Sequence, residues 1–233
     1  MLQICSYSGP AYIKTMKYII MCGGTYSQWE KPRQLMKIGN ETIVERTIRL
    51  LKENGVEDIY ISANDPVFED YAPVLYHHNR YRGDGSDNNG FWTDCFYPTD
   101  EPVCYIFGDV VFSPEAIRRI VEYKTSIIMM FASAPPFAPE FTKRFAEPFA
   151  LKVMDQDYLK KSIKDTEEYY LQGKFKRKPI MWELWQVITR GKLNVIDSST
   201  WIHINDYTCD VDNPGDLERI MEAMNESTEI LRC

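Results

Sequence analysis

"KYIIMCGG" (residues 17–24) and "ETIVERTIRLLKENGVEDIYIS" (41–62) are the two stretches that decide the fold. The first contains a short apolar run, Tyr18–Met21, which is typical of a strand buried on both faces. In the second, apolar residues recur along one stripe of a helix predicted from about residue 42 to residue 54. A second predicted strand, Asp58–Ser62, follows within four residues. The sequence therefore predicts a βαβ unit, whose two strands are parallel and whose crossover is right-handed.

The same alternation of strands and helices continues along the chain. Further strands are predicted at 74–77, 103–107, 127–132, 149–153, 193–196 and 201–204, and further helices at 114–123, 157–172, 181–189 and from 213 onward. This order predicts an α/β fold with a mostly parallel central sheet flanked by helices, of the Rossmann-like kind.

Composition narrows the class of protein. The chain has 233 residues, of which 44% are apolar and 26% charged, as in a soluble globular protein with one substantial core. A formal net charge of −7 disfavours binding to a nucleic acid polymer. No apolar stretch approaches the ~18 residues of a membrane span. The six cysteines form no C-x-x-C pair, so we expect reduced thiols and a cytoplasmic location.

Two glycines and two cations follow the first predicted strand. Gly23 and Gly24 let backbone N–H groups approach an anion, because no Cβ stands in the way. Lys31 and Arg33 then add positive charge within ten residues of the glycine pair. Together, these glycines and cations predict a binding site for a triphosphate. The alternative is an ordinary Gly-Gly turn followed by two surface cations.

Carboxylates follow two other extended segments. In "YIFGDVVF" (105–112), Asp109 ends an apolar strand, and in "CDVDNPGDL" (209–217), Asp210 and Asp212 point to the same side. Carboxylate oxygens are the ligands that Mg²⁺ prefers, so these three residues predict a magnesium site. Alternatively, Asp109 is a turn residue and Asp212 a capping residue, while Asp216 stabilises the start of the last helix.

These segments, in this order, resemble the nucleotidyltransferases of the GT-A-like fold. The resemblance rests on "MCGG", "PRQL", "ERTI", "IFGDVVF" and "DVDNPGDL". It is close over 17–62, patchy to 123 and present again at 206–221. "NNGFWTDCFY" (88–97) is similar to the Asn-Asn segment of the phosphocholine cytidylyltransferase branch.

The resemblance implies transfer of a nucleoside monophosphate, with CMP from CTP favoured, to a phosphorylated small molecule. Pyrophosphate is released, Mg²⁺ is the cofactor, and surface polysaccharide or lipid precursor synthesis is the implied setting. Residues 1–16 would be an N-terminal extension and 17–233 the nucleotidyltransferase domain. The implied site residues are Lys31, Arg33 and Asp109 for catalysis; Cys22, Gly23, Gly24, Thr25, Asn88, Asn89 and Gly108 for the nucleotide; and Asp109, Asp210 and Asp212 for the metal.

The sequence departs from the family at two places. The third glycine of the family's loop is missing, and Arg33 stands where the family has lysine. Arginine keeps a permanent charge and a bidentate fork, so we expect phosphate binding to survive.

The acceptor is expected to bind to residues 133–200, a small insertion that carries no resemblance to the family. In "PIMWELW" (179–185), Trp182 and Trp185 share one helical face, with Glu183 beside them. An aromatic wall with a carboxylate suits a cationic group such as a quaternary amine. The alternative is that both tryptophans belong to the core.

Two other functions remain open. A GT-A glycosyltransferase would take a sugar nucleotide, but it normally has a D-x-D motif where "GDVVF" has one carboxylate. A non-catalytic nucleotide-binding relative is the other alternative. A homodimer is also left open by the sequence.

Overall fold

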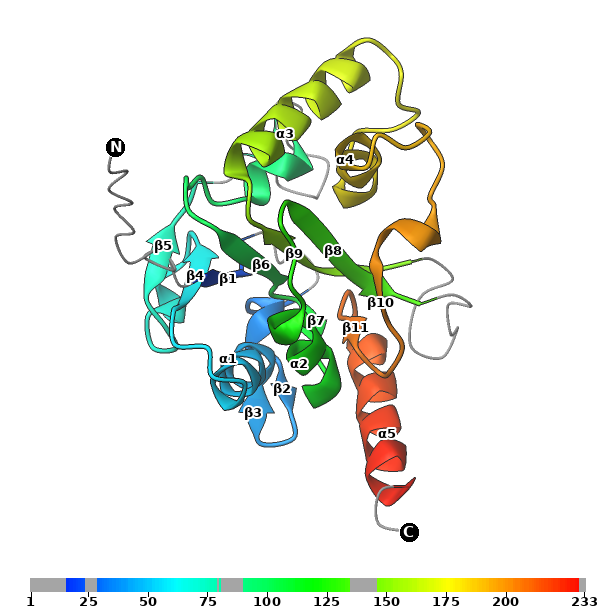
Figure 1. The fold of residues 1–233 in the computed structure, drawn as a ribbon. Coiled ribbons are helices and arrows are strands. Elements are labelled where there is room, and N and C mark those ends of the chain that lie inside the picture. The colour runs from blue at the N-terminus through cyan, green and yellow to red at the C-terminus, as the bar shows by residue number, and fades with distance from the viewer. Residues whose placement is uncertain (1–15, 24–28, 79, 81–89, 135–145, 231–233) are drawn as a thin grey trace, which may run out of the picture.

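A computed structural model describes residues 16–23, 29–78, 80, 90–134 and 146–230. Its centre is a seven-stranded sheet with the order β10-β8-β9-β6-β1-β4-β5 (Figure 1). Four of the six strand pairs are parallel, and β9 runs antiparallel to both of its neighbours. The strands of this sheet are β1 (Lys17–Met21), β4 (Ile59–Ala63), β5 (Val74–Tyr76), β6 (Val103–Phe107), β8 (Ile128–Ser133), β9 (Pro148–Val153) and β10 (Ile202–Ile204). The predicted α/β class is therefore confirmed.

Helices cover both sides of this sheet. In the view of Figure 1, α1 and α2 lie below the sheet, and α3 and α4 lie together above it. The helices are α1 (Ile43–Glu53), α2 (Pro114–Glu122), α3 (Gln156–Leu171), α4 (Met181–Ile188) and α5 (Pro214–Ile230). Because both faces are covered, the central strands are apolar along their length, and all five residues of β6 are buried.

The predicted βαβ unit is formed by β1, α1 and β4. Thr42 caps α1, and Glu45 completes a capping box with it. Gly55 ends the helix with φ +77°, in the left-handed region that glycine adopts without a steric penalty. The strands β1 and β4 then pair in parallel, with Ile20 opposite Ile61.

One predicted strand is absent. Residues 193–196 form a turn rather than a strand, because Asn194 has φ +61°. Its side chain donates to the carbonyl of Lys174 and accepts from the N–H of Lys176. The apolar pattern misled the prediction, since Val195 and Ile196 are 42% and 51% exposed.

Two small strand pairs lie outside the main sheet. β2 (Lys37–Ile38) pairs with β3 (Glu41–Thr42), and β7 (Val110–Val111) pairs with β11 (Cys209–Asp210), both antiparallel. The second pair brings the C-terminal part of the chain to the end of β6. The part of the chain that the structure describes also contains short 3₁₀ turns: η1 (Arg33–Leu35), η2 (Pro66–Phe68), η3 (Trp92–Cys95) and η4 (Ser198–Thr200).

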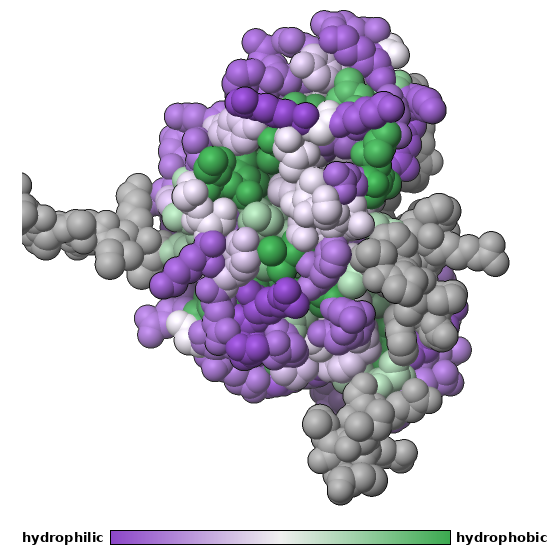
Figure 2. Space-filling view, turned by 45° about the vertical axis from the view of Figure 1, so that its right-hand side comes forward, coloured by the Kyte–Doolittle hydropathy of each residue, from purple (hydrophilic) through white to green (hydrophobic). Residues whose placement is uncertain are grey.

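The described surface in the view of Figure 2 is mostly polar. Figure 2 shows hydrophilic residues over most of one face, with hydrophobic residues visible in separate recessed patches. Among the described residues, no helix combines the length and the apolar character needed to cross a membrane.

Candidate active site

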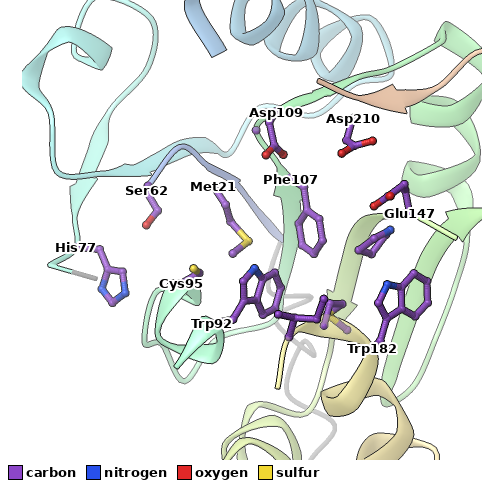
Figure 3. A pocket seen from close by; sticks show the side chains of 15 residues that line it. Met21, Ser62, His77, Trp92, Cys95, Phe107, Asp109, Glu147, Trp182 and Asp210 are labelled. Atoms are coloured by element: carbon purple, nitrogen blue, oxygen red, sulfur yellow. The ribbon is translucent and has the colours of Figure 1, made fainter. Parts of the chain in front are cut away.

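A cavity of about 210 Å³ opens at the carboxyl ends of the parallel strands. Gly23 follows β1, Ser62 lies near the end of β4, and Gly108 follows β6; all three line it. Open α/β sheets bind their ligands at this edge. Aromatic and apolar side chains from η3 and α4 form the opposite wall, among them Trp92 and Trp182 (Figure 3).

Gly108 is placed where no larger residue fits. Its N–H donates to the carbonyl oxygen of Met21 (3.1 Å), and an added Cβ would lie 2.5 Å from the same oxygen. Glycine therefore lets the ends of β1 and β6 approach closely, which fixes the position of Asp109 immediately after it.

Asp109 and Asp210 both line this cavity, although they are 101 positions apart in the sequence (210 − 109). The N–H of Val211 donates to the carbonyl of Asp109 (2.8 Å), and Asp210 pairs with Val110 in the β7–β11 ribbon. Ser113 adds further bonds to this segment, since its N–H donates to Thr208 (3.0 Å). These backbone contacts bring the two carboxylates to one side of the cavity (Figure 3).

Arg33, one of the two cations predicted from the sequence, contacts two of the predicted carboxylates. Its guanidinium lies 2.9 Å from Asp109 Oδ2 and 2.9 Å from Asp212 Oδ1, and it donates to the carbonyl of Val211 (3.0 Å). Asp212 therefore pairs with Arg33 and does not line the cavity, whereas Asp109 does both. Among the described residues, these contacts use three of the five guanidinium N–H groups.

The acidic residues fit a divalent cation. Within the described ranges, no three His, Cys, Asp or Glu side chains form a group that holds a metal ion by protein ligands only. Mg²⁺ is usually bound by one or two carboxylates together with substrate phosphates and water. The two aspartates on the cavity wall, Asp109 and Asp210, match that kind of site.

The other predicted nucleotide residues lie in different places. Cys22 is completely buried behind the cavity wall, and its N–H donates to Ser62 (2.8 Å). Burial raises the pKa of the Cys22 thiol well above its usual value, and the charge of Asp109 adds to this, so the thiol stays protonated. Lys31 is exposed and does not line the cavity. Gly24, Thr25, Asn88 and Asn89 lie outside the described residues.

The predicted acceptor residues separate into two groups. Trp182 lines the cavity, but Glu183 and Trp185 do not. The Glu183 carboxylate accepts from Arg177 Nε (2.8 Å) and from the N–H of Ile180 (3.0 Å). It is the third residue of α4, so it caps the helix instead of facing a ligand. Trp185 is buried and donates to Thr200 (2.8 Å).

Sequence reasoning missed Glu147 and His77, which also line the cavity. Glu147 directly precedes β9, and because β9 is antiparallel to β6, its start lies at the carboxyl end of β6. The sequence has no signal for this reversal. His77 follows β5, a position that the strand-edge rule favours for ligand contacts. Its Nε2 lies 2.5 Å from the Asp94 carbonyl, so this nitrogen carries the proton and donates.

Among the described residues of the cavity wall, the carboxylates have no lysine or arginine beside them. Asp109, Glu147 and Asp210 line it, and no described lysine or arginine does. An anionic triphosphate needs compensating positive charge in such a place. Arg33, next to Asp109, has charge of that sign, and a divalent cation held by the aspartates would add more.

Solved structures share this fold at low sequence identity. Rv0371c from Mycobacterium tuberculosis H37Rv superposes with a TM-score of 0.52 and 15% identity, covering 89% of this chain and 97% of that chain. A Bacillus anthracis protein assigned as glucose-1-phosphate thymidylyltransferase, crystallised with sucrose, gives 0.52 and 17%, with 89% and 94% covered. A comparison with curated proteins finds no match.

A family model for the MobA-like NTP transferase domain matches residues 18–152, which is more than half of the chain. The match includes β1, the end of β6 and Asp109, and therefore one side of the cavity described above. This chain belongs to the family of MobA-like NTP transferase domains.

Proposed function

We propose that this protein transfers a nucleoside monophosphate, CMP from CTP by preference, onto a phosphorylated small molecule, and that pyrophosphate is released. Family membership supports nucleotidyl transfer as the class of reaction. The observation that carries the proposal is that Asp109 and Asp210 line one cavity beside Gly23 and Gly108. The preference for CTP rests on the resemblance at Asn88 and Asn89.

The reaction needs no general base. A phosphate oxygen of the acceptor is already ionised at neutral pH. It forms a bond to the α-phosphorus while the bond to the bridging oxygen of pyrophosphate breaks, and the electron pair leaves with pyrophosphate. Catalysis then consists of positioning and charge stabilisation. The fully buried, protonated Cys22 thiol is consistent with a reaction that uses no protein nucleophile.

The side chains have separate roles in this proposal. Asp109 and Asp210 would hold Mg²⁺, which supplies positive charge at the phosphates when it is bound. Arg33 fixes the position of Asp109 through their ion pair and adds positive charge near the phosphates. Lys31, in the exposed loop, adds charge at the entrance. Asp212 acts through Arg33, because its carboxylate pairs with the guanidinium rather than facing the cavity.

The acceptor binds at the aromatic end of the cavity in this proposal. Trp182 and Glu147 lie on the same side of the cavity in Figure 3, and Trp92 faces into it. Trp92 is held against Phe107 with ring centroids 5.7 Å apart. Aromatic rings with a carboxylate favour a cationic group, so a phosphorylated amine is preferred over a phosphorylated sugar. In this proposal Glu147, rather than Glu183, is the carboxylate that contacts the cationic group of the acceptor. Such an acceptor would serve the synthesis of surface polysaccharide or lipid precursors.

Two measurements test this function. The first is a thermal-shift screen of the four ribonucleoside triphosphates with Mg²⁺. A ligand at 100 times its dissociation constant adds about 2.7 kcal/mol to the free energy of unfolding. The second is pyrophosphate release from CTP with phosphorylated amines, amides and sugars. Turnover of a sugar nucleotide to a nucleoside diphosphate would indicate a glycosyltransferase instead, and binding without turnover a non-catalytic relative.

Asp109→Asn is the sharpest variant. We expect kcat to fall by about 100-fold or more, because the charge that holds the cation is lost while the shape is kept. Asp70→Asn is the matched control, since Asp70 is exposed and lines no part of the cavity. Unchanged turnover in Asp109→Asn would remove this carboxylate from the mechanism.

A further inference from the structure

A second cavity, of about 240 Å³, lies between α4 and residues 191–201. In Figure 1 this segment runs beside α4 toward β10. Trp182 lines this cavity and also the candidate active site. The Trp182 ring is therefore a wall common to both cavities.

Three tryptophans line the second cavity, together with aliphatic and polar side chains. Trp182, Trp185 and Trp201 contribute their rings, and the centroids of Trp182 and Trp201 are 5.2 Å apart. The indole N–H of Trp185 donates to Thr200 (2.8 Å), and that of Trp201 donates to the Ser133 carbonyl (3.1 Å). Because these polar groups are bonded within the protein, the two rings offer a ligand apolar surface.

Among the described lining residues of the second cavity, one positive and one negative side chain balance each other. Lys192 and Asp197 line it, both are exposed, and they have opposite signs. Asp197 Oδ1 also accepts from the hydroxyl of Ser199 (2.7 Å). This differs from the active-site cavity, whose described carboxylate, lysine and arginine lining is acidic only. A neutral ligand therefore fits the second cavity better than a cation does.

The segment that encloses the second cavity is held at several points. The N–H of Asn194 donates to Gln186 Oε1 (2.5 Å), and the hydroxyl of Thr200 donates to the Asp197 carbonyl (2.7 Å). Val195 and Ile196 lie between these points, line the cavity, and are 42% and 51% exposed. The cavity is thus formed before any ligand binds, which lowers the cost of binding.

We propose that this second cavity is a ligand site for a neutral, planar molecule of one or two fused rings. An apolar cavity of about 150 Å³ is known to hold benzene, so a volume of 240 Å³ admits a bicyclic ring. A ligand there contacts Trp182 and restrains the N-terminal turn of α4, which borders the active site. The site is separate from nucleotidyl transfer and does not depend on the proposed function.

Indole is the probe, and titration calorimetry on the full chain is the assay. We expect saturable binding with a dissociation constant of about 1 mM or tighter. Val195→Trp should fill the cavity and weaken indole binding by at least 10-fold. Val67→Trp is the matched control, because Val67 is 39% exposed on η2 and lines neither cavity. If Val195→Trp does not fold, Ile196→Arg places a charge at the same mouth and should have the same effect.

Hydrogen exchange tests the effect on the shared wall. With indole bound, amides in the peptide that contains Ile180–Trp182 should exchange more slowly, and peptides of β4 should not change. Three results would overturn the proposal: no saturable binding of indole, equal binding by Val195→Trp and wild type, or tighter binding of tetramethylammonium than of indole. Unchanged exchange at Ile180–Trp182 in a saturated complex would refute the restraint on α4. None of these readouts requires a nucleotide, so they remain informative if the proposed function fails.

Discussion

Replacing Arg33 by alanine should destabilise the fold even without a nucleotide. The guanidinium lies 2.9 Å from carboxylate oxygens of both Asp109 and Asp212, and it donates to the Val211 carbonyl (3.0 Å). It thereby connects η1, the end of β6 and the segment that leads into α5. Arg33→Ala removes all three contacts at once.

The expected loss can be worked out from the exposure of these groups. The side chains of Arg33 and Asp109 are 23% and 29% exposed, so this charge-assisted bond belongs to the class that contributes about 1.5 kcal/mol or more. Asp212 is 50% exposed, and solvent screening limits that pair to about 0.5 kcal/mol. The two ion pairs together give about 2 kcal/mol, or about 6 °C in Tm for a chain of this size, and the bond to the Val211 carbonyl adds to this.

Urea unfolding monitored by tryptophan fluorescence measures this loss. Arg33→Lys should recover part of the stability, because one ammonium is a point charge and lacks the fork that spans two carboxylates. Arg118→Ala is the control, since Arg118 also pairs with two carboxylates, Glu115 and Glu122, but all three side chains are about half exposed or more. If Arg33→Ala costs no more stability than Arg118→Ala, the guanidinium does not hold these segments together.

Three further outcomes follow from other contacts of the fold. Gly108→Ala should lower the free energy of unfolding by about 2 kcal/mol in urea titration, because its Cβ would lie 2.5 Å from the Met21 carbonyl; full stability would contradict that contact. Lys152→Met should cost about 2 to 4 kcal/mol by the same assay, since the buried amine donates to three carbonyls at the end of α2; a neutral result would show that water replaces it. Hydrogen bonding to Arg49 lowers the pKa of Glu41, so its contribution is complete above the unfolded-state value of about 4.3 and disappears as the pH falls. Below about pH 4.5, the free energy of unfolding of wild type should therefore fall more steeply with decreasing pH than that of Glu41→Gln. The same pH dependence in both proteins would refute this.

The order of strands and helices could be read from the sequence because it depends on local pattern. The apolar run of β1, the apolar stripe of α1 and the Gly-Asp pair after β6 are three such patterns. Each is formed by residues that are close to one another in the sequence. Periodicity, capping and glycine placement act over that range. The prediction failed at 193–196 because Asn194 adopts a left-handed turn that distant residues stabilise.

The arrangement of the candidate site depended on contacts between distant segments. Asp210 reaches Asp109 because the N–H of Val211 bonds to the Asp109 carbonyl, and Glu147 reaches the same cavity because β9 runs antiparallel to β6. The sequence by itself determined which residue types follow the strands, since strand ends are set locally. Only the tertiary structure decided which of these side chains meet, because pairing across more than a hundred residues is fixed by strand direction and by the docking of the C-terminal segment.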